Sequence, residues 1–152
     1  MISPYTFLFI FTLLIDIVLI YILYNFHLNC FDKVYTIIML FIHFVFIIGL
    51  FFNIHSFLEI GHVSIFLSFF IFIFIENIYI LILLLSFIVI TYLSWDYFGD
   101  CPLKIGDEPF MKFLLQKSGI NTTYPNPEKS NIEKVFITLV IPFLLYKIYN
   151  RL

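Results

Sequence analysis

The sequence predicts an all-α integral membrane protein, a bundle of about four transmembrane helices that forms one domain over residues 1–152. Hydrophobic residues make up 62% of the chain and charged residues 12%, whereas soluble domains contain roughly 45–50% and about 25%. The stretch 63–93 is apolar except for Glu76 and Asn77, and no globular core requires so long an apolar segment. The lipid bilayer is therefore the first partner that we expect.

Composition also argues against one class of partner. The formal net charge is -2, and the 8 Lys and Arg residues are scattered without forming a basic patch, so no nucleic-acid partner is expected. The chain has no Ala and 22 Phe, a bias typical of an AT-rich genome. Because lipid accepts any large apolar side chain, we interpret the Phe residues as lipid-facing bulk and not as a cofactor site.

The first two spans are expected over residues 5–25 and 34–52. The first lacks the basic segment and the small-residue cleavage site of a secretory signal, so it should be retained as a helix. A polar linker separates it from the second, which is long enough to cross roughly 30 Å of hydrocarbon. The polar residues within 53–62 are expected to end the second span.

The third apolar block, 63–93, has two interpretations. As one helix it would extend about 46 Å at about 1.5 Å per residue, which requires tilt or projection beyond the bilayer. As a hairpin that turns at Glu76 and Asn77, it would give five spans in total and move the carboxylate to the headgroups. The turn contains neither Gly nor Pro, so a reversal there is poorly encoded. We therefore favour the single helix, with the hairpin as the alternative.

Charge, Gly and Pro are concentrated in residues 96–133, which we expect to lie outside the membrane. Within this segment 109–118 is predicted to form a short amphipathic helix on the membrane surface, with Pro109 in its first turn and Gly119 as its C-cap. Asn121 begins an Asn-Thr-Thr sequence that fits the glycosylation acceptor pattern, which has meaning only in a lumenal loop.

A fourth span is expected over 134–149, with Lys134 at one end and Lys147 and Arg151 at the other as snorkelling anchors. In the four-span arrangement Lys33 and the five Lys between 104 and 134 face one side. The positive-inside rule would then place the 96–133 segment in the cytoplasm and both ends of the chain on the opposite side.

Three ionisable residues are predicted to lie at membrane depth: Asp16, His43 and Glu76, the last beside Asn77. Each costs about 2.5–3.5 kcal/mol in a lipid environment and therefore needs a partner or water. One hypothesis is that they meet as a proton or ion relay. The other is that each is neutral or hydrogen-bonded locally and serves helix packing.

No metal, haem or other cofactor is expected. His55, Glu59 and His62 have helical spacing, and Glu59-x-x-His62 has the form of one half of a di-iron motif, but the second half is missing. Cys101 has no His in its own segment to act as a base, so an enzyme is not favoured. Cys30 and Cys101 could form a structural disulfide only on an oxidising side of the membrane.

The stretch 93–103 reads Leu-Ser-Trp-Asp-Tyr-Phe-Gly-Asp-Cys-Pro-Leu and is followed by Glu108. It resembles a family of small multi-pass membrane proteins of unknown function, mainly bacterial, in which an aromatic helix end runs into Cys-Pro-Leu-Thr and a Glu; similar segments occur in large DNA viruses. Here Lys104 replaces the Thr. The segments around His43 and over 132–146 are similar to the same family. The resemblance implies a multi-pass architecture with a single span before Cys101, and no activity.

The residues of this motif also have a direct physical interpretation as a structural turn. Pro102 prevents continuation of a helix, Gly99 allows an unusual exit angle, and Trp95 is typical of headgroup depth. Cys101 and Glu108 complete the motif turn.

The function that we expect is that of a non-enzymatic scaffolding, assembly or accessory component, with other membrane protein subunits as candidate partners. The alternative is a proton- or ion-handling subunit of a transport or energy-transducing complex. A third interpretation, a thiol oxidoreductase, would require Cys30 and Cys101 to lie within about 7 Å of each other.

Overall fold

The computed structural model describes residues 3–98 and 127–152. Of these residues 88% are helical and none is in a strand, so the expected all-α fold is confirmed. The described ranges contain five α-helices, with a short 3-10 helix after the third. They are α1 (Pro4–Asn25), α2 (Cys30–Phe52), α3 (His55–Ile71), η1 (Phe72–Phe74), α4 (Ile78–Phe98) and α6 (Pro127–Tyr149).

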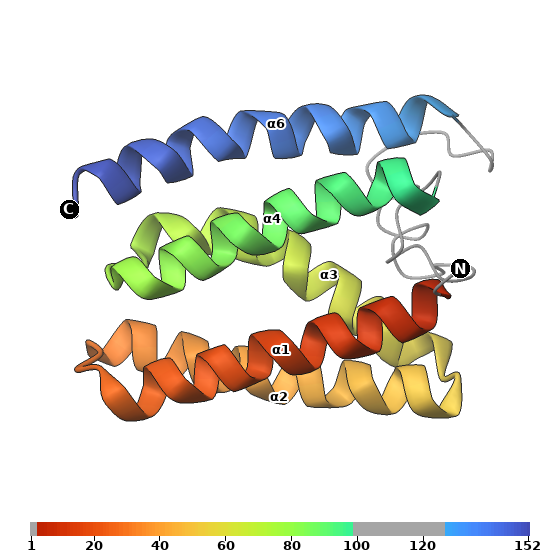
Figure 1. Ribbon diagram of the computed structural model, residues 1–152, viewed down its shortest axis with the longest axis horizontal. Helices are drawn as coiled ribbons and strands as arrows, with labels where there is room; N and C mark the ends of the chain where they lie inside the picture. The colour runs from red at the N-terminus through yellow and green to blue at the C-terminus, as the bar shows by residue number, and fades with distance from the viewer. Residues whose placement is uncertain (1–2, 99–126) are drawn as a thin grey trace, which may run out of the picture.

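The helices run back and forth between two ends of the molecule (Figure 1). We call one the Asp32 end; it holds the α1–α2 loop, the turn between η1 and α4, and the end of α6. The other is the Asn53 end, with the start of α1, the α2–α3 turn and the end of α4. Helices α1 and α2 pack together, α4 packs on α6 and α1, and α3 packs on α2 and crosses the bundle obliquely. The start of α1 and the end of α6 therefore lie at opposite ends.

The second helix begins earlier than residue 34, where we expected it. The side-chain oxygen of Asn29 accepts a hydrogen bond of 2.7 Å from the backbone N–H of Asp32, which is the geometry of an N-cap. Residues 30–33, which the sequence indicated as linker, therefore form the first turn of α2. Asparagine is a recognised N-cap residue, but we placed the start of this span by its apolar residues alone, which begin at residue 34.

The polar segment 53–62 is mostly helical and is not a linker. Asn53 adopts a left-handed conformation with φ 55, and the N–H of Ile54 donates to the carbonyl oxygen of Gly49 at 2.9 Å. This C-cap ends α2 and lets α3 begin at His55, so only two residues separate the helices. His55, Glu59 and His62 consequently belong to α3.

The single long helix expected over 63–93 is not formed, and the hairpin alternative matches the structure. Helix α3 ends at Ile71, η1 follows, and α4 begins at Ile78. A helix end leaves backbone N–H or C=O groups without hydrogen-bond partners, and apolar side chains in the turn cannot provide such partners. The partners come from elsewhere in the chain, from Asp32 of α2 and Lys147 of α6, as described below.

Close packing of α2 on α3 depends on two glycines. A Cβ atom on Gly49 would lie 2.9 Å from Phe57 Cβ, and one on Gly61 would lie 2.8 Å from Phe46 Cγ. Both distances are shorter than Cβ contacts in real proteins. The absence of side chains at these positions brings α3 close to the inner face of α2.

The span predicted over 134–149 lies within α6, which starts earlier, at Pro127, and contains Pro142 in its interior. Helix α4 continues to Phe98. Both ends of the predicted 96–133 segment are therefore helical. The amphipathic helix predicted over 109–118 lies outside the described residues.

Two of the helices, α1 and α2, are long and apolar enough to cross a membrane, a criterion that core helices of soluble proteins also meet. Shorter apolar helical stretches lie in α4 (Ile78–Ser94) and α6 (Thr138–Tyr149).

Candidate functional site

The midpoints of α1 and α2 are joined by a pair of ionisable side chains. His43 Nδ1 lies 2.6 Å from Asp16 Oδ1, and the side chains are 7% and 14% exposed. Asp16 is the residue after Ile15, which lies on the buried face of α1. His43 lies between Met39 and Phe46 on the buried face of α2. Because the two helices are antiparallel and similar in length, their central turns face each other.

Electrostatics explain why these residues pair. A single carboxylate or imidazolium at this depth would be desolvated without compensation, which costs several kcal/mol. An ionised Asp16 can only accept a hydrogen bond, so in that state Nδ1 of His43 carries the hydrogen and donates it. In a neutral imidazole, Nε2 is then left with a lone pair. Among the described residues, no side chain or backbone group hydrogen-bonds to this second nitrogen.

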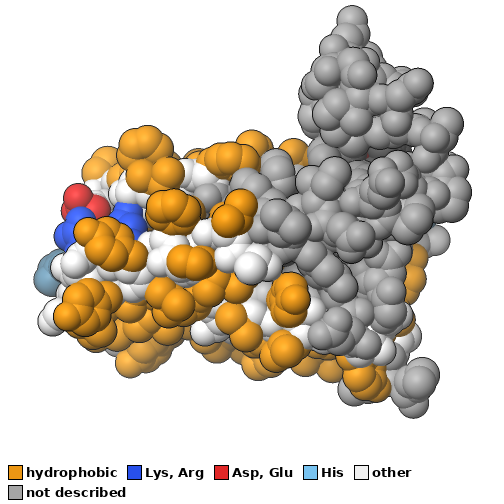
Figure 2. Space-filling view, turned by 90° about the horizontal axis from the view of Figure 1, so that it is seen from above, with side chains coloured by type: hydrophobic (Ala, Val, Ile, Leu, Met, Phe, Trp, Pro, Cys, Tyr) orange, Lys and Arg blue, Asp and Glu red, His pale blue; other side chains and the backbone are white. Residues whose placement is uncertain are grey.

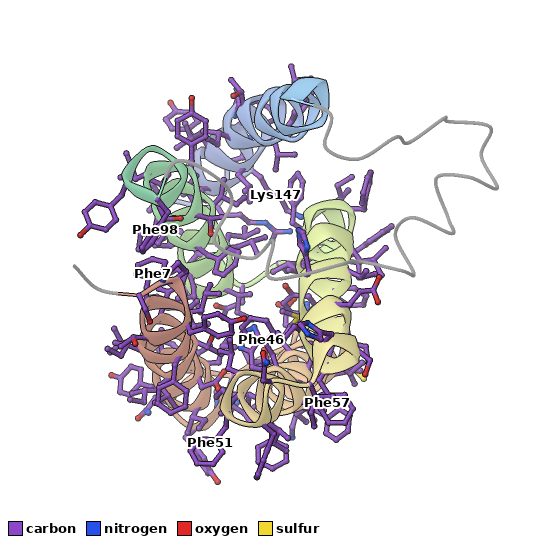
Figure 3. All side chains as sticks on the ribbon, turned by 90° about the vertical axis from the view of Figure 1, so that its right-hand side faces the viewer. Phe7, Phe46, Phe51, Phe57, Phe98 and Lys147 are labelled. Carbon is purple, nitrogen blue, oxygen red and sulfur yellow. The ribbon has the colours of Figure 1, made fainter. Side chains whose placement is uncertain are left out.

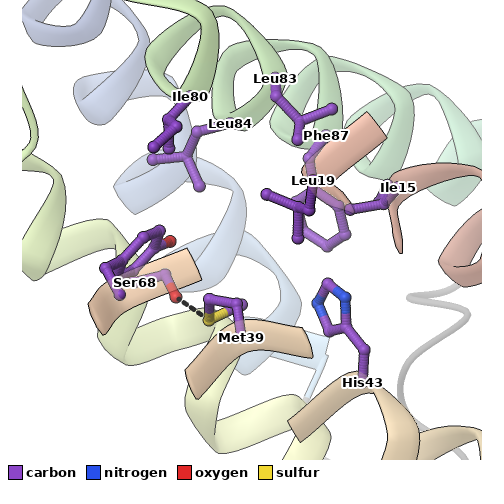
Figure 4. A pocket seen from close by; sticks show the side chains of 10 residues that line it. Ile15, Leu19, Met39, His43, Ser68, Ile80, Leu83, Leu84 and Phe87 are labelled. Carbon is purple, nitrogen blue, oxygen red and sulfur yellow. Dashed lines mark hydrogen bonds between the residues drawn. The ribbon is translucent and has the colours of Figure 1, made fainter. Parts of the chain in front are cut away.

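A cavity of about 30 Å³ adjoins His43 on the side of the Asp32 end. Figure 4 shows the imidazole extending from α2 toward Leu19 and Phe87. The lining is apolar except for three side chains that can hydrogen-bond strongly, namely those of His43, Tyr35 and Ser68. One water needs about 10–15 Å³ of such space and two to four polar partners, so the cavity has room for about two waters.

Two polar side chains of this cavity are neighbours: Tyr35 of α2 lies beside Ser68 of α3. Ser68 Oγ also lies 3.4 Å from Met39 Sδ and donates to the carbonyl of Ser64 at 2.9 Å. Tyr35, Met39 and His43 follow one another at spacings of four on the buried face of α2.

A second cavity, of about 10 Å³, adjoins His43 on the side of the Asn53 end. Its walls include the rings of Phe7, Phe11, Phe46 and Phe87. The hydroxyl of Thr12, which also lines it, already donates to the carbonyl of Leu8 at 2.8 Å. His43 thus separates a larger cavity, lined also by Tyr35 and Ser68, from a smaller one, lined also by Thr12 and Thr91.

Glu76 does not join the pair. It lies at the Asp32 end with its side chain 57% exposed, where it accepts from Asn29 Nδ2 at 3.0 Å and faces Arg151 at 3.7 Å. Asn77 caps α4, because its Oδ1 accepts from the N–H groups of Tyr79 and Ile80 at 3.0 and 3.2 Å. Of the four residues predicted as a relay, the structure brings Asp16 and His43 together and places Glu76 and Asn77 at one end.

Two polar residues hold the turn between η1 and α4: Asp32, which sequence reasoning did not single out, and Lys147, which it named only as a snorkelling anchor. The carboxylate of Asp32, 1% exposed, accepts from the N–H of Glu76 at 3.1 Å and from that of Asn77 at 2.8 Å. The ammonium of Lys147 donates to the carbonyls of Phe72, at 2.9 Å, and Ile73. Asp32 thus satisfies the start of α4, and Lys147 satisfies the end of η1.

A sequence signal for Asp32 existed. It precedes Tyr35 by three residues and Thr36 by four, which places it on the stripe that continues through Met39 and His43. A carboxylate on the buried face of a helix needs partners, and this helical periodicity could have separated Asp32 from the polar linker to which we assigned it.

The other predicted site residues provide no second constellation in the described ranges. Trp95 lies in the last turn of α4. The remaining residues of the motif turn and the glycosylation candidate, namely Gly99, Cys101, Pro102, Glu108 and Asn121, lie outside the described residues. Cys30 is an exposed free thiol in the first turn of α2. Within the described part of the chain, no group of three or more His, Cys, Asp or Glu could hold a metal ion.

Comparison with known proteins adds no relative: no protein-family model matches the chain, and no curated protein or solved structure is significantly similar to it. Arguments about function therefore depend on the chain's own geometry.

Proposed function

We propose that this chain is an integral membrane protein that crosses the bilayer five times and acts as a non-enzymatic structural or accessory component. The observation that carries the proposal is the distribution of side chains, in which large apolar residues face outward along the helices. Ile17 is 63% exposed, Phe41 67% and Phe143 65%. Figure 2 shows apolar side chains over much of the described surface in one view, with the charged side chains at one end.

Several polar and charged side chains, in contrast, are buried inside the bundle. The buried polar and charged residues are Thr12, Asp32, Thr36, His43, Glu59, Ser68, Thr91 and Ser94. Figure 3 shows the contrast in α2, where Phe46 points inward and Phe51 outward. A soluble bundle would lose free energy by exposing so many large apolar side chains to water, whereas lipid tails solvate them favourably. Polar groups inside a membrane bundle are explained by their need for partners.

Helix lengths support five crossings. At about 1.5 Å per residue, α1 and α2 are each longer than the roughly 30 Å of the hydrocarbon core. The apolar stretches of α4 (Ile78–Ser94) and α6 (Thr138–Tyr149) are shorter than this thickness, and flanking residues would complete these two crossings. Helix α3 is shorter, with 17 residues, and η1 extends it. The turn that follows is compatible with a lipid environment, because Asp32 and Lys147 provide hydrogen-bond partners for its backbone groups.

The structural role is supported by what the polar contacts connect. Asp16 and His43 join α1 to α2, Asp32 joins α2 to the start of α4, and Lys147 joins α6 to η1. Each contact ties two helices together, which is the role expected of buried polar groups in a scaffold. The outward-facing apolar side chains would then contact lipid and other membrane protein subunits.

Five crossings change the expected topology. In sequence, the five Lys between 104 and 134 fall between the end of α4 and the first turns of α6, whereas Lys33, Lys147 and Arg151 belong to the Asp32 end. The positive-inside rule would place the Asn53 end in the cytoplasm. The start of α1 would be cytoplasmic and the end of α6 would lie on the opposite side, whereas the four-span arrangement put them on the same side.

Thiol labelling tests the membrane topology. In a Cys101→Ser background, Cys30 reports the Asp32 end, and a Cys30→Ser, Ser56→Cys variant reports the Asn53 end, since Ser56 is exposed in the first turn of α3. In sealed native vesicles, a membrane-impermeant maleimide should label one variant, and in inverted vesicles the other. Labelling of both from the same side would exclude a membrane crossing by α2.

Purification in mild detergent tests the accessory role. The full chain should migrate with other membrane proteins, which mass spectrometry would identify. If it migrates as a single chain, the proposal of an accessory component is wrong, whatever the labelling shows.

A further inference from the structure

We infer that the Asp16–His43 pair is a proton-binding site at the centre of the bundle, which exchanges its proton with the solvent at the Asp32 end through Ser68 and Tyr35. The inference does not depend on the accessory role. It begins with a contrast in how the two ring nitrogens of His43 are used. Nδ1 is hydrogen-bonded to Asp16 at 2.6 Å, whereas Nε2 has no protein partner in the described part of the chain.

The side chain that carries this free nitrogen is almost completely buried. His43 is 5% exposed, and it lines the cavity of about 30 Å³. A buried nitrogen with a lone pair is costly unless it receives a hydrogen bond. About two waters fit in the cavity and would find Nε2, Ser68 and Tyr35 as partners. The geometry therefore favours a hydrated connection from the imidazole to these hydroxyls.

Proton uptake at this position is balanced by charge. Before uptake, Asp16 is a carboxylate, His43 is neutral, and the pair carries one negative charge. A hydronium ion at the Asp32 end supplies the proton, and each group of the relay accepts one proton and passes on another, until Nε2 of His43 binds it. The relay groups regain their starting protonation, and the pair becomes an imidazolium and a carboxylate with no net charge. A neutral pair is the less costly state in a low-dielectric interior.

Among the described residues that line the two cavities, no other charged group competes for the proton. Among the residues that line them, α1 contributes apolar side chains and Thr12, and α4 contributes apolar side chains and Thr91. Helix α3 contributes Gly61 and Ser68. Apart from His43, the titratable group that the described residues contribute to these linings is Tyr35 of α2.

The direction of access follows from the unequal cavities. Toward the Asp32 end, the side chains of Ser68 and Tyr35 line the larger cavity, and Asp32 lies one turn beyond Tyr35 on the same face of α2. Toward the Asn53 end, the cavity of about 10 Å³ holds at most one water and is walled largely by Phe rings.

Proton exchange of the paired hydrogen tests the site in the full chain, reconstituted in lipid nanodiscs. A hydrogen held between Nδ1 and Oδ1 in such a short bond should give a strongly deshielded proton NMR signal, which Asp16→Asn and His43→Gln should abolish. Its exchange rate with water is then measured in variants that keep the pair. Tyr35→Phe and Ser68→Ala should each slow this exchange roughly tenfold, the effect of losing one hydrogen-bonding group from a relay.

Matched controls lie on the opposite side of His43. Thr12→Val and Thr91→Val remove hydroxyls from the smaller cavity and should leave the exchange rate unchanged. Absence of the deshielded signal from the wild-type chain would overturn the proton site. Unchanged exchange in Tyr35→Phe and Ser68→Ala, or slower exchange in the two Thr variants, would overturn access from the Asp32 end.

Discussion

The hydrogen bonds of Asp32 provide the sharpest test of how the chain reverses direction between η1 and α4. This carboxylate is 1% exposed and accepts from two backbone N–H groups, those of Glu76 and Asn77. A hydrogen bond to a charged group contributes about 1.5–3 kcal/mol, and a buried donor left without a partner costs about 1–3 kcal/mol. We expect Asp32→Ala to lower the free energy of unfolding by about 3–5 kcal/mol.

A graded series separates the hydrogen bonds from the rest of the side chain. Asp32→Asn keeps one acceptor oxygen without the charge and should lose about half as much free energy as Asp32→Ala. Lys33→Ala is the matched control, because Lys33 is the exposed neighbour of Asp32 on the same helix and should change stability by less than about 0.5 kcal/mol.

Two measurements read out this series. Denaturant titration in mixed micelles gives the free energy of unfolding, and amide hydrogen exchange followed by mass spectrometry reports the segment 75–80. Asp32→Ala should increase exchange at Glu76 and Asn77 before the rest of α4 is affected. If Asp32→Ala and Lys33→Ala have the same stability and the same exchange at these amides, the explanation of the turn by Asp32 is wrong.

Four further predictions follow from the packing and the ion pairs. Gly61→Ala should destabilise the protein by about 1–3 kcal/mol in thermal unfolding, because the new Cβ meets the Phe46 ring, whereas an unhindered Gly to Ala change in a helix stabilises. Asp16→Leu should cost about 3–5 kcal/mol in denaturant titration, and a second change, His43→Leu, should recover most of this loss, since a buried pair is worth little against apolar residues. Lys147→Met should lower the unfolding free energy by about 2–3 kcal/mol through loss of donors to two carbonyls, and equal stability of this variant and wild type would contradict the contact. Glu76→Gln should stay within about 0.5 kcal/mol of wild type in the same titration, because this ion pair is exposed.

The sequence predicted most helices well because apolar periodicity and length are local signals. The span expected over 5–25 corresponds to α1, and the apolar residues of 34–52 lie within α2. The start of α2 was missed because its signal is a single capping side chain, that of Asn29, which precedes polar residues typical of a loop.

The reversal after η1 was not predictable in the same way, because its causes are far away in the chain. Asp32 is 44 and 45 residues from the amides that it accepts from, and Lys147 is 75 and 74 residues from the carbonyls that it contacts. Local turn chemistry gave the opposite indication, because the turn contains neither Gly nor Pro. Such distant capping is visible only once the helices are assembled.

The candidate site was predicted in part for a related reason. A carboxylate and an imidazole in apolar segments are individually conspicuous, so Asp16 and His43 could be named from the sequence. Whether a third group reaches them depends on where the helices end, and the assumption of one long helix placed Glu76 at the wrong depth. Ser68 and Tyr35 carry no such signal, because hydroxyls in apolar helices are common and usually serve packing.

The position of Lys147 has a consequence for how the chain is made. During synthesis from the N-terminus, the residues of η1 and α4 leave the ribosome after Asp32 and before Lys147. Asp32, which accepts from the amides of the turn, has therefore already been synthesised when the turn forms. The carbonyls of Phe72 and Ile73 lack the ammonium of Lys147 as a donor until α6 has been synthesised. A nascent polypeptide interrupted before α6 would therefore form this turn with the hydrogen bonds to Asp32 and without those from Lys147.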